Sequence, residues 1–551
     1  MLSIPDNLVT APPGFALFAA IAFLSVAAIV AWEVISIRGP RTPKGLRRPP
    51  QPSGATLLGG HAHLWGSNVS HNPSENQLVK WAREYGEIYE IRLGVERWVI
   101  VNSPEAVKDI FDKNGALTGS RPALRVMNIL SGGYRMLVMP YGKQWRNIRA
   151  IAHRCLNLKS ADAMKPSSSL ESHRYLLDVL QDPVNFLSHV KRYTSSVIMF
   201  SIYGRRVLDL NDPVLKAIYD ELGHFSEASS QIQTVDKFPV LEHLPRSLQW
   251  WRPKWEAYHQ KEVELWMGLW NDLKKQLNAG IRTGCFAEKF QEEDYLAMGI
   301  SEVQAAYVAG SMIEAGSDTT QLSMNSMILA MVAYPEVVPK AQKELDAVVG
   351  DRLPQFEDMP NLPYIRAMVK EVLRWRSVSN DHVRHVTSHW DRVNITDRPR
   401  DNQGDVVYKD YFIPEGTSVV INHWALHFDP ELFPDPERFN PDRFYDTPVN
   451  NLTAGECIHT NDVKLRDHWS FGAGRRVCAG YNLAENSLLI LTARLLWAFD
   501  VLPAVDKATG RPVKYDVWNY TPTRLFGPKP FPVDFKVRSE EKKKIILAAR
   551  G

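Results

Sequence analysis

One cysteine stands in a setting where a thiol could do chemistry. Cys478 lies in the stretch FGAGRRVCAG, residues 471 to 480, just before an apolar segment that we expect to be helical. A helix N-terminus and the neighbouring Arg475 and Arg476 should lower the pKa of the thiol and favour the thiolate. A buried cysteine is usually a small hydrophobic residue, and a nucleophilic one needs a partner such as His468. Because no familiar cysteine-hydrolase signature surrounds either residue, we interpret Cys478 as a thiolate ligand to a metal.

A second polar group interrupts a long apolar segment, SEVQAAYVAGSMIEAGSDTTQLSMNSMILAMVAYPEVV. Hydrophobicity on all sides predicts a helix through the centre of a soluble body. Within this segment stand Glu314, Asp318 and Thr319, close to Gly316. A buried acid beside a hydroxyl is costly unless it is satisfied or used, and a threonine can donate to the carbonyl four residues earlier. Taken alone, this motif favours a helix kink with a satisfied polar patch over a catalytic pair.

A third group is the pair Glu371 and Arg374 in NLPYIRAMVKEVLRWR, where apolar residues recur at helical spacing. Residues three apart on a helix can touch, although exposed pairs of this kind are common and contribute little. Arg438 lies in the proline-rich run HFDPELFPDPERFNPDRF and could join the pair. Alternatively, the run is a surface meander without that contact.

The elements that position these residues should form one body from residue 60 to residue 551, mainly α with a smaller β portion. The stretch GEIYEIRLGVERWVIVNSPEAV predicts two short strands joined near Gly94, then a helix entered through Ser103 and Pro104. The chain of 551 residues has a formal net charge of +3, too small to indicate a nucleic-acid partner. Its four cysteines are widely spaced, which favours a reduced, cytosol-facing protein.

The N-terminal region has a different character. Residues 14–32 are nineteen uncharged, mostly apolar positions, about the length that spans a bilayer as a helix. Basic residues follow this segment, so the positive-inside rule places residues 1–13 in the lumen and the bulk of the chain in the cytosol. A cleaved signal peptide is the main rival, but its apolar region is usually shorter and follows a basic segment. Residues 33–59 are rich in proline and basic side chains and should form a stiff hinge.

In order along nearly the whole chain, these pieces resemble the motifs of the cytochrome P-450 family of haem-thiolate monooxygenases. FGAGRRVCAG matches the family signature Phe-x-x-Gly-x-Arg-x-Cys-x-Gly at every fixed position, and AGSDTT resembles the oxygen-activating centre of the long distal helix. EVLR resembles the Glu-x-x-Arg pair, PERF its partner arginine, and WRNIR the Trp-x-x-x-Arg of a helix beside the haem. The resemblance implies the cytochrome P-450 fold, preceded here by one transmembrane helix. The implied structural triad consists of Glu371, Arg374 and Arg438.

The resemblance also assigns the residues that act on the cofactor and on oxygen. Cys478 would be the axial ligand of the iron of haem b, and its thiolate would favour O–O cleavage. Asp318 and Thr319 would deliver protons to dioxygen through water. Basic side chains at the other positions suit charge-assisted bonds to the haem propionates. The implied haem-binding residues are Arg121, Trp145, Arg149, His385, Phe471, Arg476 and Cys478.

One segment departs from the family pattern. Many members follow the Glu-x-x-Arg helix with a proline-rich strand that lines the distal pocket, whereas this chain has RSVSNDHVRH. We hypothesise that Asn380, Asp381 or His382 contacts a polar or basic group on an otherwise apolar substrate. The alternative is that these side chains face away from the pocket.

The function implied by the resemblance is insertion of one oxygen atom from O2 into a small lipophilic molecule, such as a secondary metabolite or an aromatic compound. Electrons would come from NADPH through a separate flavoprotein reductase, since the chain has no flavin or Rossmann fingerprint. The anchor implies a single-pass protein of the endoplasmic reticulum membrane with a cytosolic catalytic domain. Rival functions are a haem-thiolate isomerase, dehydratase or peroxygenase, and a membrane-anchored haem sensor or carrier. The reductase would dock on a set of basic residues, Lys143, Arg146, Lys464, Arg466 and Arg475. Alternatively, these residues are ordinary surface charges.

Overall fold

The computed structural model describes residues 40–56, 59–65, 76–94, 96–122, 124–230, 234–237, 239–378, 385–386, 404–521 and 525–548. The predicted anchor at 14–32 lies outside these ranges, and so do the candidate substrate residues Asn380, Asp381 and His382. Within these ranges, no helix combines the length and the hydrophobicity needed to cross a membrane.

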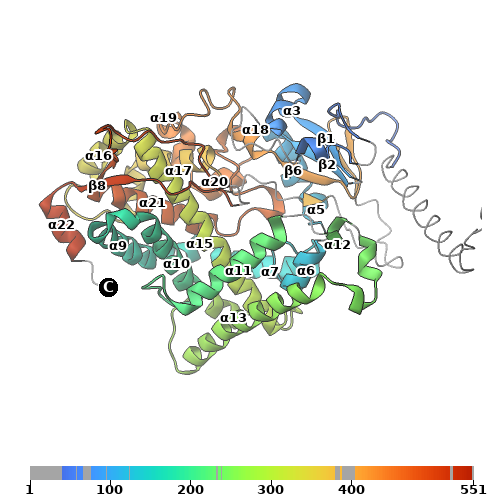
Figure 1. Ribbon diagram of the computed structural model, residues 1–551, viewed down its shortest axis with the longest axis horizontal. Helices are drawn as coiled ribbons and strands as arrows, with labels where there is room; N and C mark the ends of the chain where they lie inside the picture. The colour runs from blue at the N-terminus through green and yellow to red at the C-terminus, as the bar shows by residue number, and fades with distance from the viewer. Residues whose placement is uncertain are drawn as a thin grey trace, which may run out of the picture.

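Helices make up most of the described chain, and the strands are short (Figure 1). This confirms the prediction of a mainly α body with a smaller β portion. The α-helices are α2 (Ala62–Trp65), α3 (Gln77–Tyr85), α4 (Pro104–Val107), α5 (Gly115–Thr118), α6 (Arg125–Ser131), α7 (Lys143–Leu156), α8 (Leu158–Asp162), α9 (Lys165–Gln181), α10 (Phe186–Tyr203), α11 (Pro213–Ser230), α12 (Thr234–Lys237), α13 (Arg252–Asn278), α14 (Phe286–Glu292), α15 (Glu302–Ala333), α16 (Val337–Val348), α17 (Pro363–Trp375), α18 (His423–His427), α19 (Asp442–Tyr445), α20 (Ala454–His459), α21 (Tyr481–Ala498) and α22 (Glu540–Leu547). The strands are β1 (Ile88–Leu93), β2 (Glu96–Val101), β3 (His385–Val386), β4 (Val406–Tyr408), β5 (Tyr411–Ile413), β6 (Ser418–Ile421), β7 (Phe499–Pro503) and β8 (Val533–Val537).

The largest sheet has the strand order β1-β2-β6-β3, and two further sheets pair β4 with β5 and β7 with β8. β1 and β2 are antiparallel with Leu93 opposite Glu96, so Gly94 lies in the turn at a φ of 61°, which glycine adopts without strain. Ser103 then caps α4 by accepting the N–H of Ala106 at 3.2 Å. The hairpin and the helix after it therefore lie where the sequence predicts them. β6 joins the sheet from far along the chain and runs parallel to β2.

Helix α15 crosses the middle of the molecule (Figure 1). It begins after Ser301, whose hydroxyl accepts the N–H of Gln304 at 3.2 Å. Most of its side chains are buried, because α10, α13, α17 and α21 pack around it. An apolar sequence on every face of a helix requires such surroundings, so the prediction of a central helix is confirmed.

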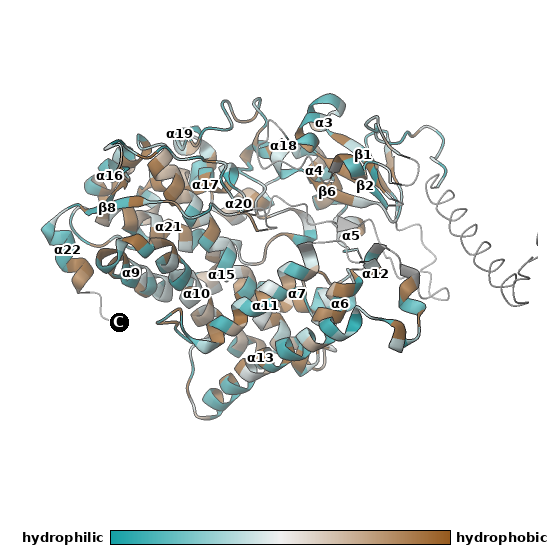
Figure 2. Ribbon diagram, in the orientation of Figure 1, coloured by the Kyte–Doolittle hydropathy of each residue, from teal (hydrophilic) through white to brown (hydrophobic). Residues whose placement is uncertain are grey.

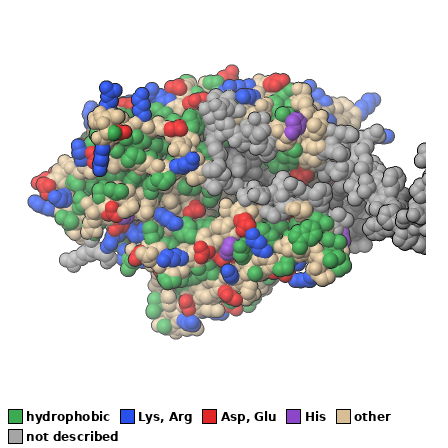
Figure 3. Space-filling model, in the orientation of Figure 1, with side chains coloured by type: hydrophobic (Ala, Val, Ile, Leu, Met, Phe, Trp, Pro, Cys, Tyr) green, Lys and Arg blue, Asp and Glu red, His purple; other side chains and the backbone are tan. Residues whose placement is uncertain are grey.

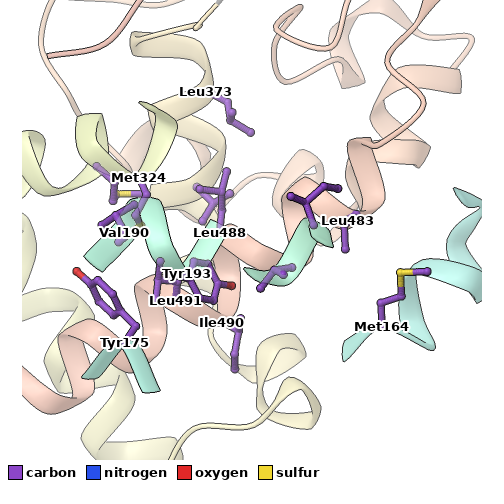
Figure 4. Packing of buried hydrophobic residues seen from close by; sticks show 14 of the residues in the cluster. Met164, Tyr175, Val190, Tyr193, Met324, Leu373, Leu483, Leu488, Ile490 and Leu491 are labelled. Carbon is purple, nitrogen blue, oxygen red and sulfur yellow. The ribbon is translucent and has the colours of Figure 1, made fainter. Parts of the chain in front are cut away.

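The core beside α15 is formed by side chains from several helices. Figure 4 shows Val190 and Tyr193 of α10 near Met324 of α15 and Leu488 of α21. The hydroxyl of the fully buried Tyr193 donates to the carbonyl of Ser487 at 3.1 Å. A buried phenol needs such a partner, so this bond ties α10 to α21.

Helices at the surface present two kinds of face. In Figure 2, α13 and α22 carry hydrophilic and hydrophobic residues side by side, as helices that cover a core do. Figure 3 shows basic and acidic side chains interspersed over the face drawn. Charges of both signs therefore share this surface, in keeping with a net charge of +3.

Candidate active site

The cysteine loop is shaped by a glycine and leads into helix α21. Gly474 has a φ of 65°, and a Cβ at this position would lie 2.3 Å from the carbonyl oxygen of Phe111. Only glycine lets the loop pack so closely on that segment. The N–H of Cys478 donates to the carbonyl of Phe471 at 2.9 Å, and α21 begins shortly afterwards at Tyr481. The backbone on both sides of the thiol is thereby held in place.

The thiol of Cys478 lies in a recess within the protein. Its side chain is exposed, whereas the other three cysteines of the chain are buried. Even so, desolvation by the surrounding protein raises the pKa of the thiol, against a backbone hydrogen bond from Gly480 and the charge of Arg149, which lower it. The prediction that Arg475 and Arg476 give a lowered pKa is therefore wrong, because desolvation outweighs the charges. Such a thiol stays protonated until a metal ion replaces its proton.

Two of the predicted haem-binding side chains pack directly on each other beside this loop. The guanidinium of Arg476 lies 4.1 Å from the ring centroid of Trp145. Arg476 also donates to three backbone carbonyls, those of Gly119, Met136 and Met139. Trp145 is buried, and within the described part of the chain its indole N–H has no hydrogen-bond partner. An unpaired buried donor is costly, and a propionate oxygen of a haem would satisfy it.

Arg121 and Arg149 complete a crowded basic group. Arg149 donates to the carbonyl of Val477, next to the cysteine, and Arg121 donates to the carbonyl of Leu137. Desolvation lowers the pKa of Arg121 to about 9. Desolvation also lowers the pKa of Arg476 to about 8, and the charges of Arg121 and Arg149 add to this effect. Because a guanidinium keeps its proton in proteins, these shifts indicate crowded positive charge that an anionic group would stabilise.

Phe471 and His385 are the remaining predicted contacts of the haem. Phe471 is half-buried, with its ring centroid 5.3 Å from that of His468. His385 begins β3 and lies opposite Val419 of β6, but its side chain is outside the described part of the structure. The open thiol, the unpaired indole N–H and the crowded guanidinium groups together fit a haem with two propionate carboxylates.

Helix α15 has an open side at the AGSDTT motif. Ala315 is exposed and Thr319 is half-buried, although most of the helix is buried. The hydroxyl of Thr319 donates to the carbonyl of Ala315 at 2.7 Å, which is the bond to the preceding turn that the sequence predicts. An exposed alanine within a central helix indicates space beside it that a small molecule could enter.

Asp318 interacts with side chains from two neighbouring helices, Lys191 of α10 and Tyr219 of α11. Desolvation raises the pKa of the Asp318 carboxyl, whereas the charge of Lys191 and the hydrogen bond with Tyr219 lower it. The net shift is upward, so this carboxyl holds a proton more readily than an ordinary aspartate does. A group with that property suits proton delivery near neutral pH.

Glu314 belongs to a buried cluster that sequence reasoning missed. Arg135 donates to both carboxylate oxygens of Glu314 and, at 2.6 Å, to Glu262 of α13. Tyr307 also donates to Glu262. Desolvation, opposed by Arg135 and reinforced by Glu262, raises the pKa of Glu314 to about 7. Arg135 is separated from its partners by 127 and 179 residues, so no local spacing indicates this contact.

The pair Glu371 and Arg374 is fully buried on α17, and Arg374 donates to both carboxylate oxygens at 2.7 and 2.8 Å. The contact expected from their spacing is therefore present. The prediction of Arg438 as the third member is wrong, because Arg443 donates to Glu371 at 3.0 Å, while Arg438 pairs with Glu336 at the surface. The run ERFNPDRF contains two Arg-Phe steps, and only the second reaches the buried acid.

The predicted docking residues differ in exposure. Arg466 is half-buried and donates to the carbonyls of Ile458, His468 and Gly472. It therefore supports the cysteine loop, and its assignment to a docking face is corrected. The exposed members of the set are Lys143, Arg146, Lys464 and Arg475.

The chain has relatives both in sequence and in structure. A family model described as Cytochrome P450 matches residues 49–514. The cytochrome P450 monooxygenase verL of Clonostachys rogersoniana is 36% identical over 504 residues, which cover 90% of this chain and 88% of the relative. The cytochrome P450 monooxygenase virE of Hypocrea virens is 35% identical, covering 91% of this chain and 87% of the relative. A solved structure of a zebra fish cytochrome P450 with progesterone has the same fold, with a TM-score of 0.64 at 22% identity over 84% of this chain and 98% of that one.

Proposed function

The chain belongs to the cytochrome P450 family and is a haem-thiolate monooxygenase, and we propose that Cys478 provides the thiolate that ligates the iron. The observation that carries this assignment is the exposed thiol of Cys478 in a recess, while the other three cysteines are buried. When bound, the haem supplies the iron at which O2 is activated. The loop around Gly474 and the start of α21 hold the sulfur in position.

The basic group next to this loop would hold the propionates of the haem. The unpaired N–H of Trp145 would donate to a propionate oxygen, and Arg149 and Arg476 would neutralise the negative charge, with Arg121 and His385 as further contacts. Phe471 is the first residue of this loop, and its ring centroid lies 5.3 Å from that of His468. The support for these roles is the unpaired buried donor and the desolvation that lowers the pKa values of Arg121 and Arg476.

Asp318 and Thr319 move protons on the open side of α15. The Thr319 hydroxyl is oriented by its bond to the Ala315 carbonyl, and Asp318 holds a proton readily because desolvation raises its pKa. Adjacent residues on a helix do not face each other, so a proton on the carboxyl would reach the hydroxyl through water. Their part is to hold and release protons for the reaction at the haem.

The substrate in this proposal is a small lipophilic molecule, a secondary metabolite or an aromatic compound. Support comes from the fungal monooxygenases among the relatives and from the exposed Ala315 on the central helix. Asn380, Asp381 or His382 would contact a polar or basic group on it. Unchanged substrate-binding spectra and product regiochemistry in Asn380→Ala and Asp381→Ala would refute that contact.

Electrons come from NADPH through a flavoprotein reductase that docks on exposed basic side chains, including Lys143 and Arg146 of α7. The catalytic body spans residues 60–551 and is tethered by a hinge at 33–59 to an anchor at 14–32 in the endoplasmic reticulum membrane. The nineteen uncharged residues of that segment, followed by basic ones, support this part of the proposal.

Oxygen-isotope labelling tests the proposed reaction. The full-length protein, reconstituted with a flavoprotein reductase and NADPH, is given a panel of apolar aromatic compounds under 18O2, with polar analogues as matched controls. We expect one labelled oxygen atom in each product, no product without NADPH, and little turnover of the polar analogues. Turnover without O2 would instead indicate an isomerase or dehydratase. A product whose oxygen atom comes only from added peroxide would indicate a peroxygenase. The absence of any product would indicate a haem sensor or carrier.

A further inference from the structure

A cavity open to solvent lies next to the side chains that contact Asp318. Its volume is about 160 Å³, enough for several water molecules at roughly 30 Å³ each. Lys216 and Asp220 in its wall are exposed. Helices α10 and α11, which contribute to this wall, both pack on α15 (Figure 1). The residues that line it are Lys191, Leu210, Leu215, Lys216, Tyr219 and Asp220.

Tyr219 connects this cavity to the interior. Its side chain lines the cavity, and its hydroxyl also interacts with the carboxyl of Asp318. The hydroxyl lies 3.2 Å from Oγ of the fully buried Ser195. The ammonium group of Lys191 lies 3.4 Å from the centroid of the Tyr219 ring, which is a cation–π contact that holds the ring in place. The phenol of Tyr219 therefore lines a cavity open to solvent and also interacts with the half-buried acid Asp318.

The groups that act electrostatically on Asp318 come from three helices. They are Lys191 of α10, Tyr219 of α11 and Glu314, one turn earlier on α15. Desolvation raises the pKa of Asp318, and Lys191 and Tyr219 lower it. An acid in such surroundings can release a proton toward the haem, but each proton that it releases has to be replaced from solvent.

We propose that Tyr219, oriented by Lys191 and Ser195, returns protons from the water of this cavity to Asp318. The inference rests on the proposed function, in which Asp318 supplies protons to the reaction. Tyr219 acts through Asp318 and is assigned no contact with substrate or haem. Neither Tyr219 nor the cavity belongs to the AGSDTT motif.

The transfer conserves protons and charge. As the O–H bond of Tyr219 breaks, an O–H bond forms on the Asp318 carboxylate, and the Tyr219 oxygen takes a proton from a cavity water. Bulk solvent replaces the proton on that water, so one proton moves inward and Tyr219 ends neutral. Burial raises the pKa of Tyr219, so a free phenolate is unfavourable and the two transfers are coupled.

The test compares Tyr219→Phe and Lys191→Met with Tyr295→Phe in the full-length haem-loaded protein. Tyr295 is a matched control because it is half-buried beside another acid and lysine, Glu302 and Lys274. Infrared difference spectroscopy, with Asp318→Asn as the reference, follows the titration of the Asp318 carboxyl. We expect Tyr219→Phe and Lys191→Met to raise the pKa of Asp318, since both wild-type interactions lower it, and Tyr295→Phe to leave it unchanged.

The second readout is NADPH-driven oxygen consumption in H2O and D2O, with the panel compound that gives the most product. We expect Tyr219→Phe to slow it on the order of tenfold and to enlarge the solvent isotope effect, because proton supply becomes limiting. An active wild type whose Tyr219→Phe variant keeps both its rate and its Asp318 titration would overturn the role of Tyr219. An equal loss in Tyr295→Phe would do the same. Absence of NADPH-driven oxygen consumption in the wild type would instead contradict the proposed function.

Discussion

At the scale of single residues, Glu371 shows what a buried charge requires. Its carboxylate accepts from Arg374 and Arg443 and from the backbone N–H of Asn440 at 2.9 Å. A carboxylate removed from water is tolerated only when its oxygens are satisfied in this way. The ion pair between Glu371 and Arg443 therefore ties α17 to α19, the helix that carries Arg443.

Removing Arg443 should destabilise the fold much more than removing Arg438. Arg443→Met leaves part of a fully buried charge uncompensated and should cost on the order of 3 kcal/mol in the free energy of unfolding. Arg438→Met removes an exposed ion pair and should cost less than about 1 kcal/mol. Urea unfolding of the two variants measures the difference, and equal losses would contradict the assignment of Arg443.

His468 should make the stability depend on pH in mildly acidic solution. Desolvation, opposed by Asp467 and reinforced by Lys370 and Arg466, lowers its pKa from 6.5 to about 4. Between these values the unfolded chain binds a proton that the folded chain does not. Stability should therefore fall as the pH drops from 6.5 to 4, by on the order of 3 kcal/mol from this group.

Urea midpoints measured at several pH values check this dependence. His468→Asn should make the curve between pH 6.5 and 4 shallower, because one titrating ring is gone. Part of the slope should remain, because desolvation also lowers the pKa of the buried His427. The control His63→Asn changes an exposed residue and should leave the slope as it is. If stability depends on pH in His468→Asn as steeply as in the wild type, another group is responsible.

Residue roles could be predicted where they depend on local spacing. Cys478 has its glycines and arginines within a few positions, and Glu371 and Arg374 share one helix face. Arg443 was missed because two Arg-Phe steps stand close together and only packing distinguishes them. Tyr219 was missed for a different reason, since its contact with Asp318 joins helices α11 and α15, which are far apart in the chain.

At the scale of elements, α15 depends on close packing as much as on hydrophobicity. A Cβ on Gly310 would lie 2.2 Å from Cδ2 of Trp266, a fully buried side chain of α13. Glycine therefore permits α13 and α15 to approach each other. The apolar sequence predicts a central helix but gives no sign of where its neighbours come closest.

Gly310→Ala should disturb this packing, whereas Gly268→Ala should not. The added methyl group has to displace the Trp266 ring, which should cost about 1–3 kcal/mol. Gly268 lies on the exposed side of α13 with nothing within 4 Å of the built Cβ, so alanine should gain up to about 1 kcal/mol of helix propensity. Urea unfolding should move the midpoints in opposite directions, and a stabilised Gly310→Ala would refute the account.

Other elements followed from local signals. The hairpin β1–β2 and the cap at Ser103 were predictable because turn and cap residues act within a few positions. The pairing of β2 with β6 was not, since it joins residues more than three hundred positions apart. Pairing between strands so far apart in the chain depends on how the whole core packs, and no short sequence pattern indicates it.

At the scale of the whole molecule, the candidate haem site is assembled from distant parts of the chain. Helix α7 contributes Trp145 and Arg149, the segment from Gly119 to Met139 supplies carbonyls to Arg476, and the cysteine loop lies at the start of α21. The unpaired donor of Trp145 and the crowded guanidinium groups are what an anionic cofactor would satisfy.

The most direct test of this account is the difference spectrum of the reduced, carbon-monoxide-bound protein, recorded for the wild type, Cys478→Ala and Cys155→Ala. Cys155 is buried in the core, so its substitution controls for loss of a thiol elsewhere. We expect a strongly red-shifted Soret band in the wild type and in Cys155→Ala, and none in Cys478→Ala. A red-shifted band that persists in Cys478→Ala, or is absent from folded, haem-loaded wild type, would contradict it.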